Sequence, residues 1–218
     1  MNWTEQLNHY CERLGPGFWA EPANAVTNLA FIVAAFVGFS LWRRHAPDDR
    51  MALALIVIVF LTGVGSFLFH TFANRWSMLA DVIPIALFIH VYLFVALNRF
   101  LALHWAVALA ATVAFFVATP PLGGLAAPFV GSSAGYVPAL AAIFVVGALV
   151  LRRDAGLARG IFAAGVVFAV SLTFRTLDGP VCEAFAPGTH FLWHLLNGTV
   201  LFLLLRVLIR HRAGLHRA

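Results

Sequence analysis

The sequence predicts an all-α integral membrane protein, a bundle of seven transmembrane helices that forms one domain over residues 1–218. Its residues are 62% hydrophobic and only 11% charged, against about 25% charged in a typical soluble domain. Seven apolar segments each approach the length of about 20 residues with which a helix spans a bilayer. Basic residues gather in alternate connections between these segments, a pattern typical of a multi-pass protein.

The predicted elements follow one another along the chain. Residues 1–21 are polar and partly acidic, without the basic start and apolar core of a cleaved signal peptide, so we expect them to be retained. The predicted spans are 24–43, 51–73, 76–98, 100–118, 135–151, 158–175 and 190–210. Between the fourth and fifth spans, residues 119–138 are rich in proline and glycine and predict a loop or interfacial segment.

The arginines predict the orientation. Eleven of them follow the first, third or fifth span or lie at the C-terminus: Arg43, Arg44, Arg50, Arg99, Arg152, Arg153, Arg159, Arg206, Arg210, Arg212 and Arg217. Only Arg13, Arg75 and Arg175 fall on the other side, so the positive-inside rule places the N-terminus outside and the C-terminus in the cytoplasm. Because these arginines are dispersed, the net charge of +5 does not indicate a nucleic-acid partner, and nothing indicates an obligatory protein partner. The alanine- and arginine-rich, lysine-free composition suggests a bacterial inner membrane, with the outer side facing the periplasm.

Five polar side chains near the outer ends of the predicted spans form the candidate site. Ser66 and His70 share one helix face, as do His190 and His194, and Asp81 follows on the third span. Ionisable residues inside a membrane usually serve function. Catalytic zinc commonly takes three protein ligands and leaves one position open, which the three histidines would satisfy. Asp81 could then accept a proton and Ser66 could hydrogen-bond an oxyanion, which predicts a hydrolytic site.

Other functions fit part of this pattern. Paired intramembrane histidines also relay protons or hold a structural metal, so a seven-helix receptor or transporter is the competing class, and an acyl-transfer enzyme using the same metal is a third. Beside the site, Arg175 and Asp178 are expected to form a local salt bridge. Cys11 and Cys182 are the only two cysteines, and both fall on the outer side, where an oxidising compartment permits a disulfide between them.

Three motifs in order resemble the alkaline ceramidases of the CREST superfamily of seven-helix membrane hydrolases. The segment GSFLFHT at 65–71, with Asp81 eleven residues after His70, is similar to the family's Ser-x-x-x-His and downstream Asp. The segment HFLWH at 190–194 is similar to its second histidine motif, and YCE at 10–12, FWAE at 18–21 and TN at 27–28 are similar to its N-terminal signature. The resemblance implies zinc on the three histidines and hydrolysis of the N-acyl amide of ceramide or a related membrane lipid. It also points to the disulfide.

The resemblance further implies a calcium ion held by the N-terminal segment. Glu12 and Glu21 match acidic ligands there, and the Tyr10 carbonyl could contribute. The sequence departs from the animal enzymes at His9, where they have an aspartate, and at Leu14, where they have an asparagine ligand. Calcium generally takes six to eight oxygen ligands. The alternative is that both glutamates cap or flank the first helix.

Overall fold

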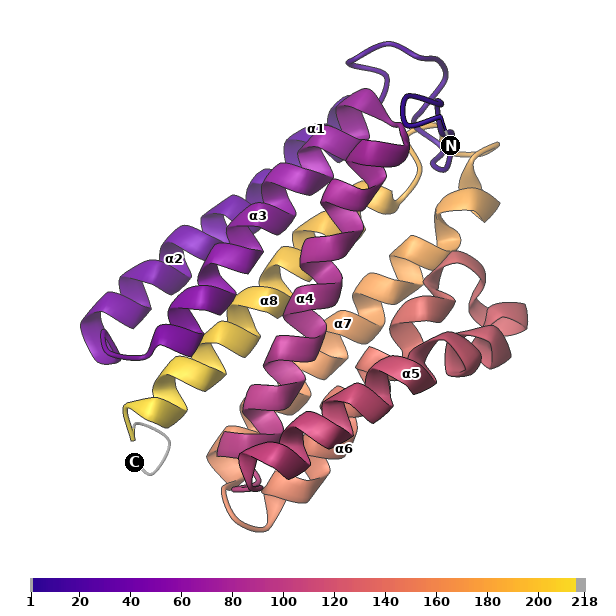
Figure 1. Cartoon of the computed structure of the whole chain (residues 1–218). Coiled ribbons are helices and arrows are strands. Elements are labelled where there is room, and N and C mark those ends of the chain that lie inside the picture. Colours follow the sequence, from indigo (N-terminus) through magenta and orange to yellow (C-terminus); the bar gives the residue numbers. More distant parts are fainter. Residues whose placement is uncertain (1, 215–218) are drawn as a thin grey trace.

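The computed structural model describes residues 2–214, which are helical apart from the N-terminal segment and the connections. The elements are α1 (Pro22–Thr27), α2 (Leu29–His45), α3 (Arg50–Phe72), α4 (Arg75–Arg99), α5 (Trp105–Val130), the 3-10 helix η1 (Gly131–Tyr136), α6 (Val137–Leu151), α7 (Ala155–Val181) and α8 (His190–Arg212). The long helices pack into one bundle (Figure 1). The predicted all-α class is confirmed.

Six helical segments of the described chain are long and apolar enough to cross a membrane. One of them, Trp105–Leu151, is 47 residues long and contains α5, η1 and α6. A straight helix of that length would measure about 70 Å, more than twice the hydrocarbon thickness of a bilayer. Figure 1 shows instead that the chain reverses at η1 and that α6 returns beside α5. The multi-pass architecture is supported, whereas seven crossings and the orientation of the termini stay predictions.

The predicted loop at 119–138 is wrong over most of its length. α5 continues to Val130 and contains Pro120, Pro121 and Pro128. Proline is unfavourable inside a helix because it lacks an N–H and its ring crowds the preceding turn. In an apolar environment, however, an irregular segment would leave more backbone groups without hydrogen bonds than a helix interrupted by proline does. The chain turns only at Gly131, whose φ of +49° suits a residue without a Cβ.

The helix α8 forms the centre of the bundle and contacts α2 on one side and α7 on the other. Its apolar side chains are buried along most of its length, including Leu204, Leu205 and Leu208. The hydroxyl of Tyr92 on α4 donates to the Leu204 carbonyl over 3.0 Å. The histidine motif at 190–194 lies at the start of α8, which is the most buried of the six candidate spans.

Residues 2–20 fold over one end of the bundle, which we call the N-terminal end and which lies at the top of Figure 1. The disulfide between Cys11 and Cys182 joins this segment to the connection after α7, with a Cα–Cα distance of 5.2 Å. The Leu7 amide donates to the carbonyl of Ala73 over 2.7 Å, just beyond the end of α3. The predicted disulfide is confirmed, and the N-terminal segment is fixed against α3 and α7.

Candidate metal centre and active site

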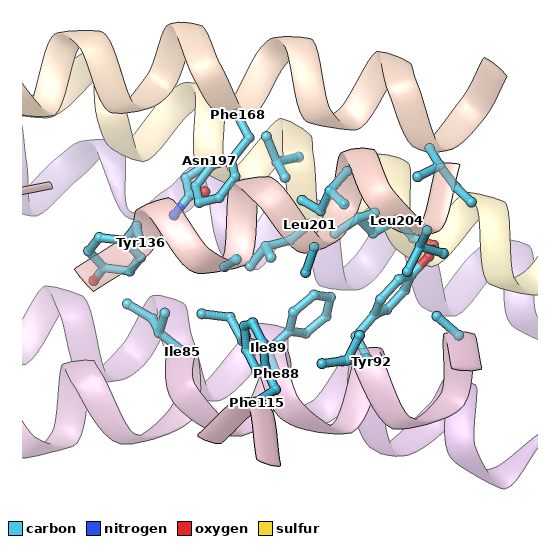
Figure 2. Close-up of a pocket in the computed structure, with 18 of the residues that line it drawn as sticks. Ile85, Phe88, Ile89, Tyr92, Phe115, Tyr136, Phe168, Asn197, Leu201 and Leu204 are labelled. Atoms are coloured by element: carbon cyan, nitrogen blue, oxygen red, sulfur yellow. The ribbon is translucent and has the colours of Figure 1, made fainter. Parts of the chain in front are cut away.

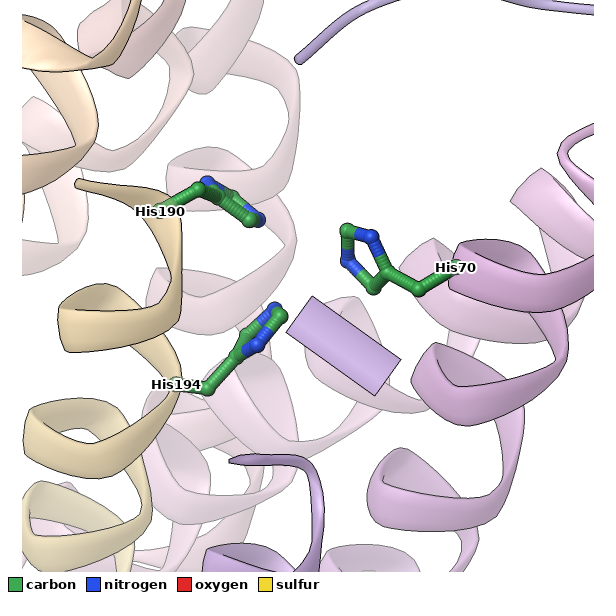
Figure 3. A group of neighbouring side chains, drawn as sticks. All are labelled: His70, His190 and His194. Atoms are coloured by element: carbon green, nitrogen blue, oxygen red, sulfur yellow. The ribbon is translucent and has the colours of Figure 1, made fainter. Parts of the chain in front are cut away.

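Three buried histidines converge at the N-terminal end of the bundle (Figure 3). His70 lies in the last turn of α3, and His190 and His194 lie in the first two turns of α8. One nitrogen of each ring lies within 4.8 Å of the others. His70 Nε2, His190 Nδ1 and His194 Nε2 are buried and have no hydrogen-bond partner. Unpartnered buried nitrogens are costly, and their convergence fits a metal ion.

Hydrogen bonds on the far side of two rings fix which nitrogen faces the centre. His70 Nδ1 lies 2.6 Å from Glu21 Oε2, and His194 Nδ1 lies 3.0 Å from Thr27 Oγ1. The Thr27 hydroxyl already donates to the Ala23 carbonyl over 2.7 Å, so it accepts from His194. Both rings therefore carry their proton on Nδ1 and turn the lone pair of Nε2 toward the cluster, as metal-binding histidines usually do.

Glu21 is itself held by three neighbours. Its Oε1 accepts from Arg13 Nε, and its Oε2 accepts from Asn24 Nδ2 over 3.1 Å as well as from His70. Burial by itself raises the pKa of this carboxyl, but the hydrogen bonds from His70, Arg13 and Asn24 outweigh burial and hold the pKa below its ordinary value. Glu21 is therefore an anion at neutral pH and orients His70 through a charged hydrogen bond.

The position of His190 depends on Asp178. One oxygen of Asp178, near the end of α7, accepts from the backbone amides of Thr189 and His190 over 2.8 and 2.9 Å and so caps the start of α8. The Tyr10 ring stacks on His190 with ring centroids 3.9 Å apart. The expected salt bridge between Asp178 and Arg175 is wrong for the described part of the chain, because Asp178 is used as a helix cap.

Ser66 and Asp81 come together across α3 and α4. Both are buried, and the Ser66 hydroxyl approaches the Asp81 carboxylate as a hydrogen-bond donor. The second oxygen of the carboxylate, Oδ1, has no partner. Asp81 is also close enough to interact electrostatically with His70. The five residues predicted from sequence thus form one buried group.

The pairing of Ser66 with Asp81 rests on a close approach between two backbones. A Cβ on Gly65 would overlap the Ala80 carbonyl oxygen and would lie 2.6 Å from the carbonyl carbon. Pro84, four residues later, has no N–H to donate to that carbonyl. The glycine and the proline therefore let α3 and α4 meet one residue before Ser66 and Asp81.

A positive charge lies beside the site on α7. The guanidinium carbon of Arg175 lies 5.3 Å from the ring centroid of Tyr136 and 5.4 Å from that of Trp193, both within cation–π range. The guanidinium also lies close enough to the Tyr10 hydroxyl to interact with it. Aromatic rings thus hold this cation next to the histidines.

An apolar cavity lies inside the bundle (Figure 2). Tyr136 and Asn197 lie at one end of it, and Tyr92 and Leu204 lie at the other. Asn197 follows His194 by three residues on α8, and Tyr136 packs against Trp193 with ring centroids 5.0 Å apart. One end of the cavity therefore lies toward the first turns of α8, which carry the histidines, and its apolar lining is suited to an alkyl chain.

The two glutamates that the resemblance assigns to calcium both flank α1. Glu12 accepts from the amides of Ala23 and Asn24 over 2.7 and 2.8 Å, and Glu21 is bound as described above. Glu12 therefore caps α1, whereas Glu21 flanks the helix and binds side chains instead of capping it. All four carboxylate oxygens accept N–H donors, which is a poor fit to calcium. The sequence interpretation missed the roles of Arg13 and Thr27. Thr27 lies in a motif that resembles the family, whereas Arg13 carries no local signal.

The fold is that of a multi-pass helical membrane protein, and its converging buried imidazoles, beside a carboxylate and a hydroxyl, are compatible with a metal site. A family model described as Ceramidase matches residues 1–217. The chain therefore belongs to the ceramidase family, whose members hydrolyse the amide bond of ceramide. A search of curated proteins gives no match. The family match confirms the prediction of an amide hydrolase over that of a receptor or transporter.

Proposed function

We propose that this protein is a zinc-dependent membrane amidohydrolase that cleaves the N-acyl bond of ceramide or a related lipid, releasing a fatty acid and a sphingoid-type amine. The observation that carries the proposal is the convergence of three buried, unpartnered imidazole nitrogens within 4.8 Å. Three neutral imidazoles without a thiolate suit zinc, and the tautomers of His70 and His194 leave their lone pairs available for it. When bound, zinc supplies a Lewis acid that polarises a carbonyl and lowers the pKa of water.

Asp81 and Ser66 supply the proton transfer and the hydrogen bond that amide hydrolysis needs. Asp81 would take a proton from the attacking water through its unpartnered Oδ1 and return it to the nitrogen of the leaving amine. Ser66 would first donate its single hydroxyl proton to this carboxylate and orient it; once Asp81 has taken the proton from water, the hydroxyl would turn and donate to the carbonyl oxygen, where negative charge develops. Burial of both side chains excludes bulk water, which strengthens these interactions.

The substrate would reach this site from within the membrane. The apolar cavity between Tyr136 and Tyr92 would hold one alkyl chain, so that only the amide lies beside the histidines. Lateral entry between helices would keep the other chain in lipid. The natural N-acyl lipid and its chain length are set by this cavity and by the groups that face its mouth.

We further propose seven crossings with the N-terminal end outside. The arginine distribution supports this orientation, and the disulfide between Cys11 and Cys182 at the N-terminal end is consistent with an oxidising compartment. In a bacterial inner membrane, the site would then face the periplasm.

The proposal is tested by comparing the purified wild type with His194→Ala, using His90→Ala on α4 as a control whose side chain lies outside the cluster. Bound zinc and fatty-acid release from ceramides and other N-acyl lipids are measured in the same preparations. We expect about one zinc per chain together with hydrolysis in wild type and control, and loss of both in His194→Ala. Hydrolysis without zinc would overturn the metal assignment, and zinc without turnover of any N-acyl lipid would indicate a structural or receptor role.

A further inference from the structure

We propose that the Arg13 guanidinium is a built-in cation at the place where the sequence resemblance puts a calcium ion, so that the histidine centre holds its shape without calcium. The inference goes beyond the proposed function and does not depend on the identity of the metal at the histidines. It rests on the contacts of Arg13, which the structure shows to be 4% exposed.

Oxygen atoms from three parts of the chain converge on this side chain. Arg13 Nε pairs with Glu21 Oε1, and Nη1 donates to the Gly15 carbonyl over 3.1 Å. Nη2 donates to the carbonyl of His70 over 3.0 Å and, less closely, to that of Thr71 over 3.5 Å. A carboxylate together with backbone carbonyls is the kind of ligand set that calcium takes. Here these oxygens face a guanidinium.

The end of α3 makes this a favourable place for positive charge. The last carbonyls of a helix have no intrahelical donor, and the helix dipole places partial negative charge there. His70 and Thr71 lie in that last turn. A guanidinium is always charged, carries five donors in a planar fork and is weakly hydrated, so it is better suited than a lysine to this buried position.

The same contacts leave little for calcium to bind. Glu12 is used to cap α1, and both oxygens of Glu21 are occupied. Leu14, which stands at the position of an asparagine ligand in the animal enzymes, offers no oxygen and is 89% exposed. A divalent ion would have to displace Arg13 or lie next to its charge.

The cation is connected to the histidine centre through one residue. Glu21 binds Arg13 with Oε1 and His70 Nδ1 with Oε2. Arg13 also binds the backbone carbonyl of His70. Arg13 is therefore a positioning residue that holds the orientation of His70 from two directions.

The test measures calcium binding and thermal unfolding of the full chain in calcium-free buffer, with calcium chloride as the added probe. Arg13→Ala is compared with Arg75→Ala, which removes a partly exposed arginine paired with Glu5 at the same end of the bundle. We expect wild type to bind no calcium and its Tm to stay within about 1 °C when calcium is added. We expect Arg13→Ala to lower the Tm on the order of 10 °C, because it leaves a buried carboxylate unpaired, and Arg75→Ala to change it little.

A conservative variant keeps the test decisive if Arg13→Ala does not fold. Arg13→Lys retains the charge but loses the planar fork, so its Tm should lie below that of wild type and remain insensitive to calcium. One calcium bound per wild-type chain with a rise in Tm would overturn the inference, as would a Tm of Arg13→Ala or Arg13→Lys equal to that of Arg75→Ala. These readouts do not involve hydrolysis or zinc, so failure of the proposed function would be recognised separately.

Discussion

Gly65→Ala tests whether the contact between α3 and α4 sets the active geometry. The added Cβ would overlap the Ala80 carbonyl oxygen and lie 2.6 Å from the carbonyl carbon, where ordinary contacts begin at 3.4 Å. The helices must therefore separate by at least about 0.8 Å, on the scale of the 1 Å displacements that cost roughly 10²-fold in rate. Because both contact atoms are backbone, no rotamer change can relieve the overlap, and overpacking of this kind costs about 1–3 kcal/mol.

The assay for Gly65→Ala is the rate of fatty-acid release from a short-chain ceramide, measured with Tm and bound metal on the same samples. We expect the rate to fall roughly 10²-fold while the three histidines keep their metal, since Ser66 and Asp81 move relative to each other more than the histidines do. Gly124→Ala on α5 is the matched control, because a Cβ there meets nothing within 4 Å. A Gly65→Ala protein with the rate and Tm of the control would refute the reasoning.

Three further predictions concern contacts that support the site and the opposite end of the bundle. Glu21→Gln should weaken metal binding roughly 10- to 100-fold, because His70 loses the charged hydrogen bond from its Nδ1 to the Glu21 carboxylate. An unchanged zinc affinity, measured by titration against a chelator, would contradict the role of Glu21 in orienting His70. Reduction of the Cys11–Cys182 bond, which closes a sequence separation of 171, should lower Tm and hydrolysis together, since the N-terminal segment is released from the site; reduced protein with both unchanged would exclude that coupling. Asp49, which caps α3 and pairs with Arg99, has a pKa below its ordinary value, because the guanidinium and two helix amides outweigh the opposing effect of burial. A lowered folded-state pKa stabilises the protein above the unfolded pKa, and this contribution is lost as pH falls through the folded pKa. Asp49→Asn should therefore lower Tm at pH 7, and its difference from wild type should shrink below about pH 4; a difference independent of pH would contradict the charge interaction.

Local sequence patterns were enough to predict the helices and to predict which histidines share a helix face. His190 and His194 lie four residues apart, so a helix alone places them on one side, and their apolar surroundings identify the membrane environment. Helix boundaries were less predictable, because the prolines of α5 indicate a break that the apolar environment overrides. A common side of the membrane permitted a bond between Cys11 and Cys182, the family resemblance pointed to it, and the structure shows it.

The sequence by itself determined a helical membrane protein with a histidine-rich site, because hydropathy and helical periodicity depend on neighbours along the chain. Only the tertiary structure decided what supports that site. Glu21 lies 49 residues from His70, and Thr27 lies 167 residues from His194, so these contacts depend on how α1, α3 and α8 pack. The same packing brings the α3 carbonyls and Glu21 around Arg13, so a guanidinium lies where the family resemblance implies calcium. Which oxygens meet at this place depends on the fold and not on the spacing of residues along the chain.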